Sequence, residues 1–326
     1  MAFKLKRIVI LFFLLFVIRC DAPRNNPLDI NNPRRELGLI EGRVLTQSLP
    51  YKPLPMTNIR FTGDGRWTQC NEQGKFKLDN IKRQPGWLFF EKLGYHRDSL
   101  YIDWQGSKAK VVEMHLNALP VVDSLLFYSS ITNRYPNVQK LELFIKAWLW
   151  DQDNDVDSVF LVCPTLKAAL NLRFNATEKF FERERISLNE LNLELPDEII
   201  GHSFVLRVKD LQGRQMDLAQ TQVERIIREE VDLKSPAGNE VVSTMPTLRW
   251  QPLNLDYHFS YTVEVRTNEV DPQLVWFKKG LAPTTSSIEV DQPLPKTPIN
   301  QYIWAVWVID RFGNRARSKF KSFQVE

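Results

Sequence analysis

Short runs of alternating apolar and polar residues fill most of this 326-residue chain, and they constrain its fold more than any other feature. The runs are rich in Val, Ile, Leu and aromatic residues, and Gly, Pro, Asn or Asp interrupts them roughly every ten residues. Because successive side chains of a strand point to opposite faces, this pattern indicates strands with one buried face. Many short strands in succession predict an all-β chain of packed sandwiches. Residues 178–191 are the one helical candidate, and their helical pattern is weak.

A turn signature, Asx-x-x-Gly, recurs beside apolar runs. Its three copies span residues 71–74, 210–213 and 310–313. The Asx side chain can accept a hydrogen bond from the turn backbone, and Gly reaches the left-handed conformation without a Cβ clash. Each copy is therefore predicted to close a hairpin. A hairpin in each third of the chain predicts three β-sandwich domains in tandem.

The chain begins with basic residues and a short apolar run. Lys4, Lys6 and Arg7 precede eleven apolar residues at 8–18, and Cys20 follows after one intervening residue. A membrane-spanning helix needs about 20 apolar residues, whereas a basic start with a shorter apolar run is typical of a secretory signal. We therefore expect the chain to be exported.

The stretch VIRC at 17–20 resembles the processing site of a bacterial lipoprotein signal, in which the cysteine receives diacylglycerol and becomes the new N-terminus. The resemblance implies a signal at 1–19, a lipid on Cys20 and a place in the bacterial envelope, at the outer membrane rather than the inner one. The pattern has a small residue where this chain has Arg19, so the alternative is an uncleaved anchor or a signal with an incidental cysteine. Residues 20–36, rich in Pro and Asn, are predicted to be a flexible tether.

The charge balance argues against nucleic acid as a partner. Removal of residues 1–19 lowers Lys+Arg from 43 to 39, which equals the 39 Asp+Glu of the whole chain, since no acidic residue is lost. A near-neutral chain lacks the basic footprint of a nucleic-acid-binding protein. Cys70 and Cys163 lie far apart, and we expect them to be buried apolar residues in different domains rather than a disulfide.

Residues 37–118 carry, in this order, the stretches LIEGRVL, KPLPMTNIRF, NEQGKFKLDNI and FFEKLGY. This order resembles the carboxypeptidase regulatory-like domain, a small transthyretin-like β-sandwich. The matching positions are Gly42, Val44, Pro53, Leu54, Ile59, Gly74, Phe76, Leu78, Gly94 and Tyr95. The resemblance implies a structural appendage and no peptidase activity.

The remaining chain is predicted to form two further sandwiches. Residues 119–231 hold strand-like runs and loosely resemble an immunoglobulin-like domain. Residues 232–326 resemble a fibronectin type III domain, because Trp250 stands where that family has its second-strand tryptophan and Tyr261 and Tyr302 follow in the expected order. The resemblance implies a core role for all three and a tyrosine-corner hydrogen bond for Tyr302.

Alternating carboxylates are the most distinctive polar feature. Within WDQDNDVDS the acidic residues are Asp151, Asp153, Asp155 and Asp157. Oxygen-rich clusters suit calcium, although the EF-hand spacing is not met, since Val stands at both the glycine and the final glutamate position. A calcium site and a solvated turn with aspartates as hydrogen-bond acceptors are the two interpretations.

Aromatic residues also alternate along the predicted strand at 141–150. Leu141, Leu143, Ile145, Ala147 and Leu149 share its core face, so Phe144, Trp148 and Trp150 fall on the other face. These three could stack on sugar rings or dock a protein. The alternative is that they pack against a neighbouring domain.

No set of catalytic residues is recognisable in the sequence. Its four histidines show no metal-ligand spacing, and neither a nucleophile elbow nor a phosphate-binding loop is present. We therefore expect a non-catalytic, membrane-anchored envelope lipoprotein that binds or scaffolds protein partners, with no cofactor unless calcium binds. The alternative is a carbohydrate-binding accessory lipoprotein with an aromatic platform, and a hydrolase built from scattered carboxylates is the third hypothesis.

Overall fold

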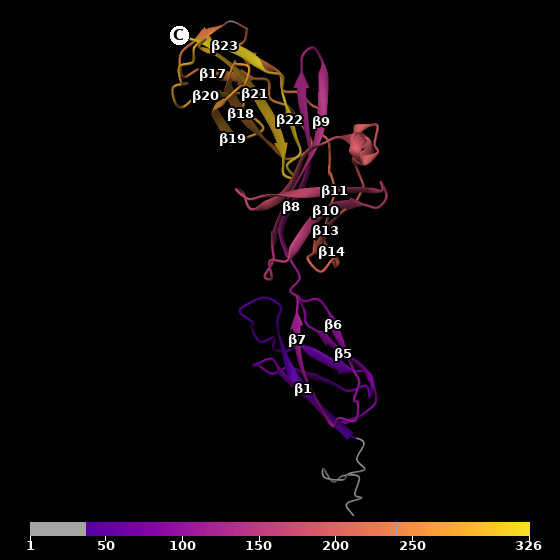
Figure 1. Ribbon diagram of the computed structural model, residues 1–326. Coiled ribbons are helices and arrows are strands. Elements are labelled where there is room, and N and C mark those ends of the chain that lie inside the picture. The colour runs from indigo at the N-terminus through magenta and orange to yellow at the C-terminus, as the bar shows by residue number, and fades with distance from the viewer. Residues whose placement is uncertain (1–36, 239) are drawn as a thin grey trace, which may run out of the picture. The chain divides into compact units, whose positions relative to one another are not determined.

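The computed structural model describes residues 37–238 and 240–326, so the predicted signal, Cys20 and the tether lie outside the described residues. Strands are almost the only regular secondary structure of the described chain, at 55% strand against 3% helix, which confirms the all-β prediction. None of the described helices is long and apolar enough to span a membrane. Two compact units are present, the first ending at Leu119 and the second covering Pro120–Glu326 (Figure 1).

The first unit, called unit 1, is a sandwich of two sheets. A three-stranded sheet has the order β4-β1-β7, and a four-stranded sheet has the order β3-β2-β5-β6. The strands are β1 (Leu37–Thr46), β2 (Asn58–Phe61), β3 (Trp67–Gln69), β4 (Lys75–Lys82), β5 (Gly86–Glu91), β6 (Asp98–Ile102) and β7 (Ala109–Leu116). β1 runs antiparallel to β4 and parallel to β7.

The core of unit 1 follows from alternation along these strands. Phe76 and Leu78 on β4 and Val44 on the neighbouring β1 share one buried cluster with Ile59 on β2 of the other sheet. These residues are among the positions that carry the sequence resemblance, and all of them are 4% exposed or less. The hydrophobic effect of burying such side chains, about 25 cal/mol per Å² of apolar area, holds the two sheets together.

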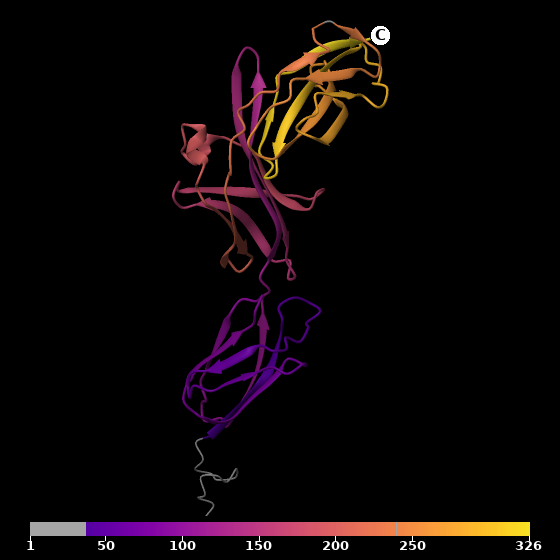
Figure 2. The ribbon, with the colours of Figure 1, turned by 180° about the vertical axis from the view of Figure 1, so that it is seen from behind.

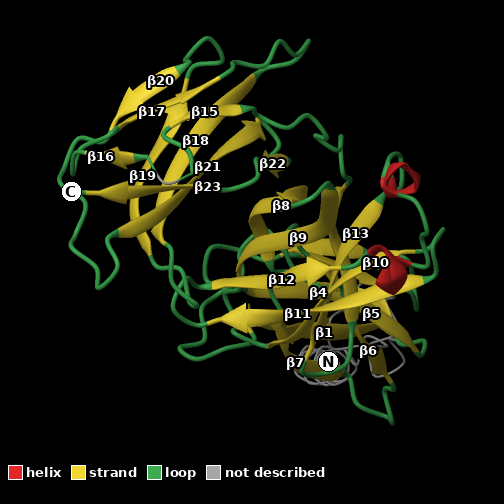
Figure 3. Ribbon diagram, turned by 90° about the horizontal axis from the view of Figure 1, so that it is seen from above, coloured by secondary structure: helices red, strands yellow, loops and turns green. Residues whose placement is uncertain are grey.

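The second unit, called unit 2, contains a 13-stranded sheet with the main order β14-β13-β10-β11-β12-β9-β8-β22-β21-β18-β19, and β23 and β16 extend from β21. A separate three-stranded sheet has the order β15-β17-β20. The strands before residue 232 are β8 (Val121–Arg134), β9 (Val138–Trp150), β10 (Val156–Cys163), β11 (Ala168–Asn175), β12 (Phe180–Ile186), β13 (Phe204–Asp210) and β14 (Gln215–Thr221). Two 3₁₀ helices, η1 (Leu188–Leu191) and η2 (Pro196–Ile199), lie between β12 and β13 (Figure 3).

The C-terminal part of unit 2 is a sandwich built around Trp250. Its strands are β15 (Leu233–Ser235), β16 (Val241–Val242), β17 (Thr247–Trp250), β18 (Phe259–Thr267), β19 (Leu274–Leu281), β20 (Ser287–Glu289), β21 (Gln301–Asp310), β22 (Arg315–Arg317) and β23 (Lys321–Val325). The Trp250 ring meets the Tyr261 ring edge-on at 5.7 Å, and Tyr302 donates a hydrogen bond from its hydroxyl to the Pro295 carbonyl. Trp250, Tyr261 and Tyr302 are buried, as an Ig-like or fibronectin III-like sandwich requires.

A short parallel strand pair joins the two halves of unit 2. β22 pairs with β8, and Figure 2 shows the long β8–β9 hairpin beside the C-terminal strands. Asn314, fully buried just before β22, accepts hydrogen bonds on its Oδ1 from the backbone N–H (2.9 Å) and hydroxyl (3.2 Å) of Ser129. The guanidinium of Arg315 lies over the rings of Tyr128 and Phe144 at 5.0 and 5.2 Å.

The three turn signatures adopt the expected local structure. In each copy the glycine N–H donates to the carbonyl of the Asx residue, and the glycine φ is positive, at 71°, 84° and 89° in chain order. The Asx carboxyl or amide oxygen accepts from turn N–H groups in all three. The second and third copies close the hairpins β13–β14 and β21–β22.

Two sequence predictions about local structure are wrong. The turn at 71–74 closes no hairpin, because β3 and β4 belong to different sheets and the turn carries the chain across the sandwich. The helical candidate at 178–191 is mostly strand, since Phe180–Ile186 pairs with both β9 and β11. Only Leu188–Leu191 is helical, and it is a single 3₁₀ turn.

Candidate functional site

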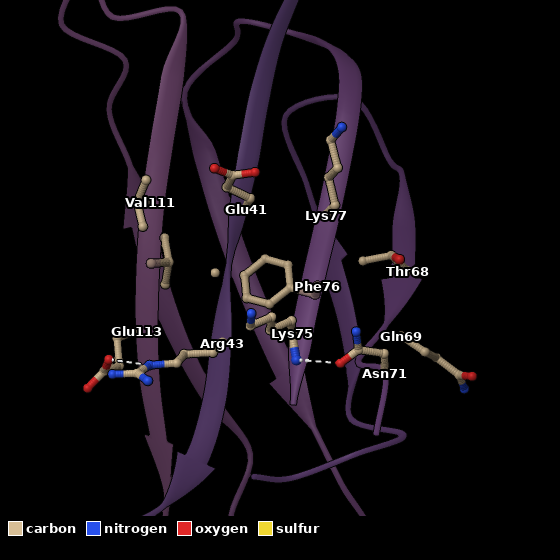
Figure 4. A pocket seen from close by; sticks show the side chains of 12 residues that line it. Glu41, Arg43, Thr68, Gln69, Asn71, Lys75, Phe76, Lys77, Val111 and Glu113 are labelled. Carbon is tan, nitrogen blue, oxygen red and sulfur yellow. Dashed lines mark hydrogen bonds and ion pairs between the residues drawn. The ribbon is translucent and has the colours of Figure 1, made fainter. Parts of the chain in front are cut away.

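A groove of about 600 Å³ lies on the outer face of the three-stranded sheet in unit 1. Figure 4 shows side chains from β1, β4 and β7 along it, with residues of the β3 strand at one side. Arg43 Nε donates to Glu113 Oε2 at 2.7 Å, and both side chains are exposed. Hydrogen bonds from His115 and Arg43 hold the pKa of the Glu113 carboxyl below its usual value.

The charges in this groove are mixed and solvated. Glu41 and Glu113 stand among Arg43, Lys75 and Lys77, and these five side chains are all exposed. Ion pairs between exposed groups contribute little free energy, because water screens both partners. The groove therefore offers neither a desolvated acid–base pair nor a strong charge of one sign.

The outer face of the other sheet of unit 1 is aromatic. Alternation along β5 puts Leu88 and Phe90 in the core with no exposed area, so Trp87 and Phe89 point outward. Strand pairing sets Tyr101 of β6 opposite Trp87, with ring centroids 5.3 Å apart at 67°. This edge-to-face geometry is a favourable arrangement of two rings.

Strand register extends this surface across the sheet. Arg60 of β2 stands opposite both Phe89 of β5 and Trp67 of β3. We call Trp67, Trp87, Phe89 and Tyr101 the aromatic face. Trp67, Trp87 and Tyr101 are 71%, 47% and 51% exposed, whereas most aromatic rings of this size in a soluble protein are largely buried.

The predicted platform of Phe144, Trp148 and Trp150 does not form a single surface. Phe144 is buried, stacked on Tyr128 at 5.5 Å. Trp148 is half-buried and packs against Phe180 at 4.8 Å. Only Trp150, at the end of β9, is exposed, at 60%. The three side chains do share one side of β9, but Tyr128 and Arg315 pack on Phe144, and Phe180 packs on Trp148.

Of the predicted calcium ligands, Asp151, Asp153 and Asp155 occupy the turn between β9 and β10, and Asp157 lies on β10. The Asp151 carboxylate accepts hydrogen bonds from the N–H groups of Asp153 (3.3 Å) and Asp155 (2.7 Å). Asp155 is buried, while Asp157 is exposed and accepts from the Ser158 hydroxyl. In residues 37–238 and 240–326 no three His, Cys, Asp or Glu side chains gather closely enough to hold a metal ion. The arrangement is that of an Asx-stabilised turn.

The cysteines and histidines of the described chain have structural contacts. Cys70 and Cys163 are free and buried, as the sequence predicts, and burial raises the pKa of the Cys70 thiol to about 11. A thiol with so high a pKa is a poor nucleophile. His115 contacts the Thr46 carbonyl and Glu113, and His202 contacts the Thr165 hydroxyl.

Sequence reasoning missed the aromatic face. The local signal was present, because Trp87 and Phe89 are two residues apart in a strand and therefore share a side. Trp67 lies 20 residues before Trp87 in the sequence, and Tyr101 lies 14 residues after it. Only the pairing register of four strands brings all of these rings to one surface, and a single sequence does not specify that register.

Comparisons with known proteins do not assign the chain to a family. No protein-family model and no curated protein matches it. Among solved structures, fibronectin(III)-like modules of Clostridium thermocellum CbhA are 12% identical with a TM-score of 0.28, covering 64% of this chain and 93% of that one. The FN1–FN3 domains of chicken CNTN1 are 10% identical with a TM-score of 0.30, covering 83% and 90%.

A solved structure of a Bacteroides uniformis protein that is only provisionally named as carbohydrate-binding is also similar. It is 10% identical with a TM-score of 0.22, and the match covers 57% of this chain and 99% of that one. Similarities at these scores carry no argument about what the present chain binds.

Proposed function

We propose that this chain is a non-catalytic binding protein of the bacterial envelope, held at a membrane by lipid on Cys20. The observation that carries the proposal is the aromatic face. A solvated sheet surface is ordinarily polar, so a group of outward-pointing Trp, Phe and Tyr side chains marks a surface that contacts a ligand or partner. The sequence leads us to expect either an envelope protein or a glycan as that partner.

The sheet beneath the aromatic face supports a binding role. Leu88 and Phe90 anchor β5 in the core, and the Trp87 N–H donates to the Thr62 hydroxyl at 2.8 Å. Rings fixed on a strand lose little conformational entropy when they bind, because their backbone is already ordered. A tether of residues 20–36 would let this rigid module reach a partner away from the lipid.

Intact mass of the membrane-extracted protein tests the anchor, with the wild type measured beside Cys20→Ser. We expect a wild-type chain that begins at Cys20 and carries acyl mass, and a variant without that mass that no longer fractionates with membranes. A wild-type chain that retains residues 1–19, or is cleaved elsewhere without lipid, contradicts the lipoprotein part of the proposal. It would mean that Arg19 prevents processing.

A further inference from the structure

We propose that the aromatic face of unit 1 binds an acidic polysaccharide, with the rings stacked on pyranose units and Arg60 paired with a uronate carboxylate. The inference rests on the proposed binding function and adds the class of ligand. It differs from the platform predicted on β9, because it lies in another unit and uses other residues.

The rings suit a sugar because exposed aromatic side chains stand side by side on adjacent strands of one sheet. One face of a pyranose carries C–H bonds, which are attracted to the electron-rich face of an aromatic ring. Trp87 and Tyr101 are neighbours on adjacent strands, and Trp67 lies beyond Arg60 on the far strand of the same sheet. β3 and β5 are two strand spacings apart, about 10 Å, so the rings extend over more than one sugar unit.

The composition of the surface favours a glycan over a protein. Along β3, β2, β5 and β6, none of the outward positions within the described strands holds an aliphatic residue. Beside the four rings these positions hold Asn58, Arg60, Gln69, Glu91 and Ser99. Aromatic and Arg side chains also occur in protein interfaces, but sugar hydroxyls need hydrogen-bonding groups directly beside the rings, and Asn58, Gln69 and Ser99 stand there.

The charge on this surface specifies an acidic ligand. Glu91 is paired with Arg97 at 2.5 Å, and Asn58 accepts a hydrogen bond from Gln69 at 2.7 Å. Arg60 is exposed in the row between Trp67 and Phe89, and it forms no ion pair with any residue of the described chain. A guanidinium can bind a carboxylate through two parallel hydrogen bonds, so Arg60 complements a uronate in a chain that lies across the rings.

Titration calorimetry of the detergent-extracted full chain tests the inference with two hexasaccharides, acidic hexagalacturonate and neutral cellohexaose. We expect hexagalacturonate to bind more tightly than cellohexaose, and its affinity to fall with added salt. Trp87→Ala should weaken hexagalacturonate binding about tenfold or more, since it removes one central ring contact. Arg60→Gln should abolish the preference for the acidic sugar, and Arg60→Lys should restore only part of it, because an ammonium lacks the planar fork.

Trp150→Ala is the matched control, because it removes another exposed tryptophan (60% exposed, against 47% for Trp87) from the surface predicted on β9. It should leave both affinities unchanged, and all variants should keep the wild-type melting temperature. Absence of hexagalacturonate binding, equal affinity for both sugars, or unchanged binding by Trp87→Ala would each overturn the inference. Cross-linking of the aromatic face to an envelope protein, with no sugar binding, would overturn it while leaving the proposed binding function and the Cys20 anchor standing.

Discussion

Replacement of Asn314 by alanine should destabilise unit 2 through the junction between β8 and β22. Asn314 has no exposed area, and its Oδ1 is the acceptor for the Ser129 N–H at 2.9 Å. Its Nδ2 donates to Asp310 Oδ2 at 3.1 Å. The alanine variant leaves the Ser129 N–H without that acceptor, at a cost of about 1–3 kcal/mol for a buried polar group.

The second lost bond adds to this cost. A hydrogen bond to a charged group contributes about 1.5–3 kcal/mol, but the Asp310 carboxylate keeps the Phe312 N–H at 2.9 Å and the Arg225 guanidinium at 3.1 Å. Loss of the hydrogen bond from Asn314 to Asp310 therefore costs only part of that energy of about 1.5–3 kcal/mol. We expect the free energy of unfolding of unit 2 to fall by about 2–4 kcal/mol, which is large among single substitutions.

Equilibrium unfolding in guanidinium chloride, followed by tryptophan fluorescence, measures this change. Asn171→Ala is the control, because Asn171 is an exposed asparagine on a strand of the same unit. Ser129→Ala should cost less than Asn314→Ala, since it removes only the hydroxyl contacts to the Arg225 carbonyl (2.9 Å) and Asn314 Oδ1 (3.2 Å) and leaves the buried backbone N–H paired. A midpoint and slope for Asn314→Ala equal to those of the control would refute the reasoning that this side chain holds the junction.

Three further outcomes are expected. Gly42→Ala should destabilise unit 1 by about 3 kcal/mol in the same unfolding assay, because an added Cβ would lie 1.8 Å from the Val112 carbonyl oxygen. An unchanged free energy of unfolding would show that β1 and β7 can move apart at no cost to make room for the methyl group. Burial raises the pKa of the Cys70 thiol from 9.0 to about 11, so the free energy of unfolding keeps this group's full contribution below pH 9 and loses it as the pH rises toward 11. Mass spectrometry should find the thiol of the folded protein unalkylated by iodoacetamide near neutral pH. Rapid labelling of Cys70 would contradict this. Calcium should leave the melting temperature unchanged, because the Asp151 carboxylate is engaged by turn N–H groups, and a rise would restore the calcium hypothesis.

The features that sequence predicted correctly depend on neighbouring residues. Alternation along β9 identified Leu143, Ile145 and Ala147 as core, and they have no exposed area. The turn at 310–313 formed as its Asx and Gly residues require. Both patterns act within a few residues, where strand geometry and glycine conformation decide the outcome.

The features that sequence missed depend on distant residues. Phe144 is buried partly because Arg315, which is 171 residues later, lies over its ring. The strand at 180–186 has an acidic and basic sequence, FFERERI, and it forms because β9 and β11 offer hydrogen bonds on both sides. Tertiary pairing overrides local preference at such places, and one sequence does not reveal the partner.

The pairing of β8 with β22 also has a consequence in time. Ser129 and Asn314 are separated by 185 residues, so β8 cannot pair with β22 until almost the entire described chain is available to fold. Until then one side of β8 is an unpaired strand edge, and such edges recruit other chains. The residues that fasten this junction in the finished fold therefore leave a vulnerable edge while the chain folds.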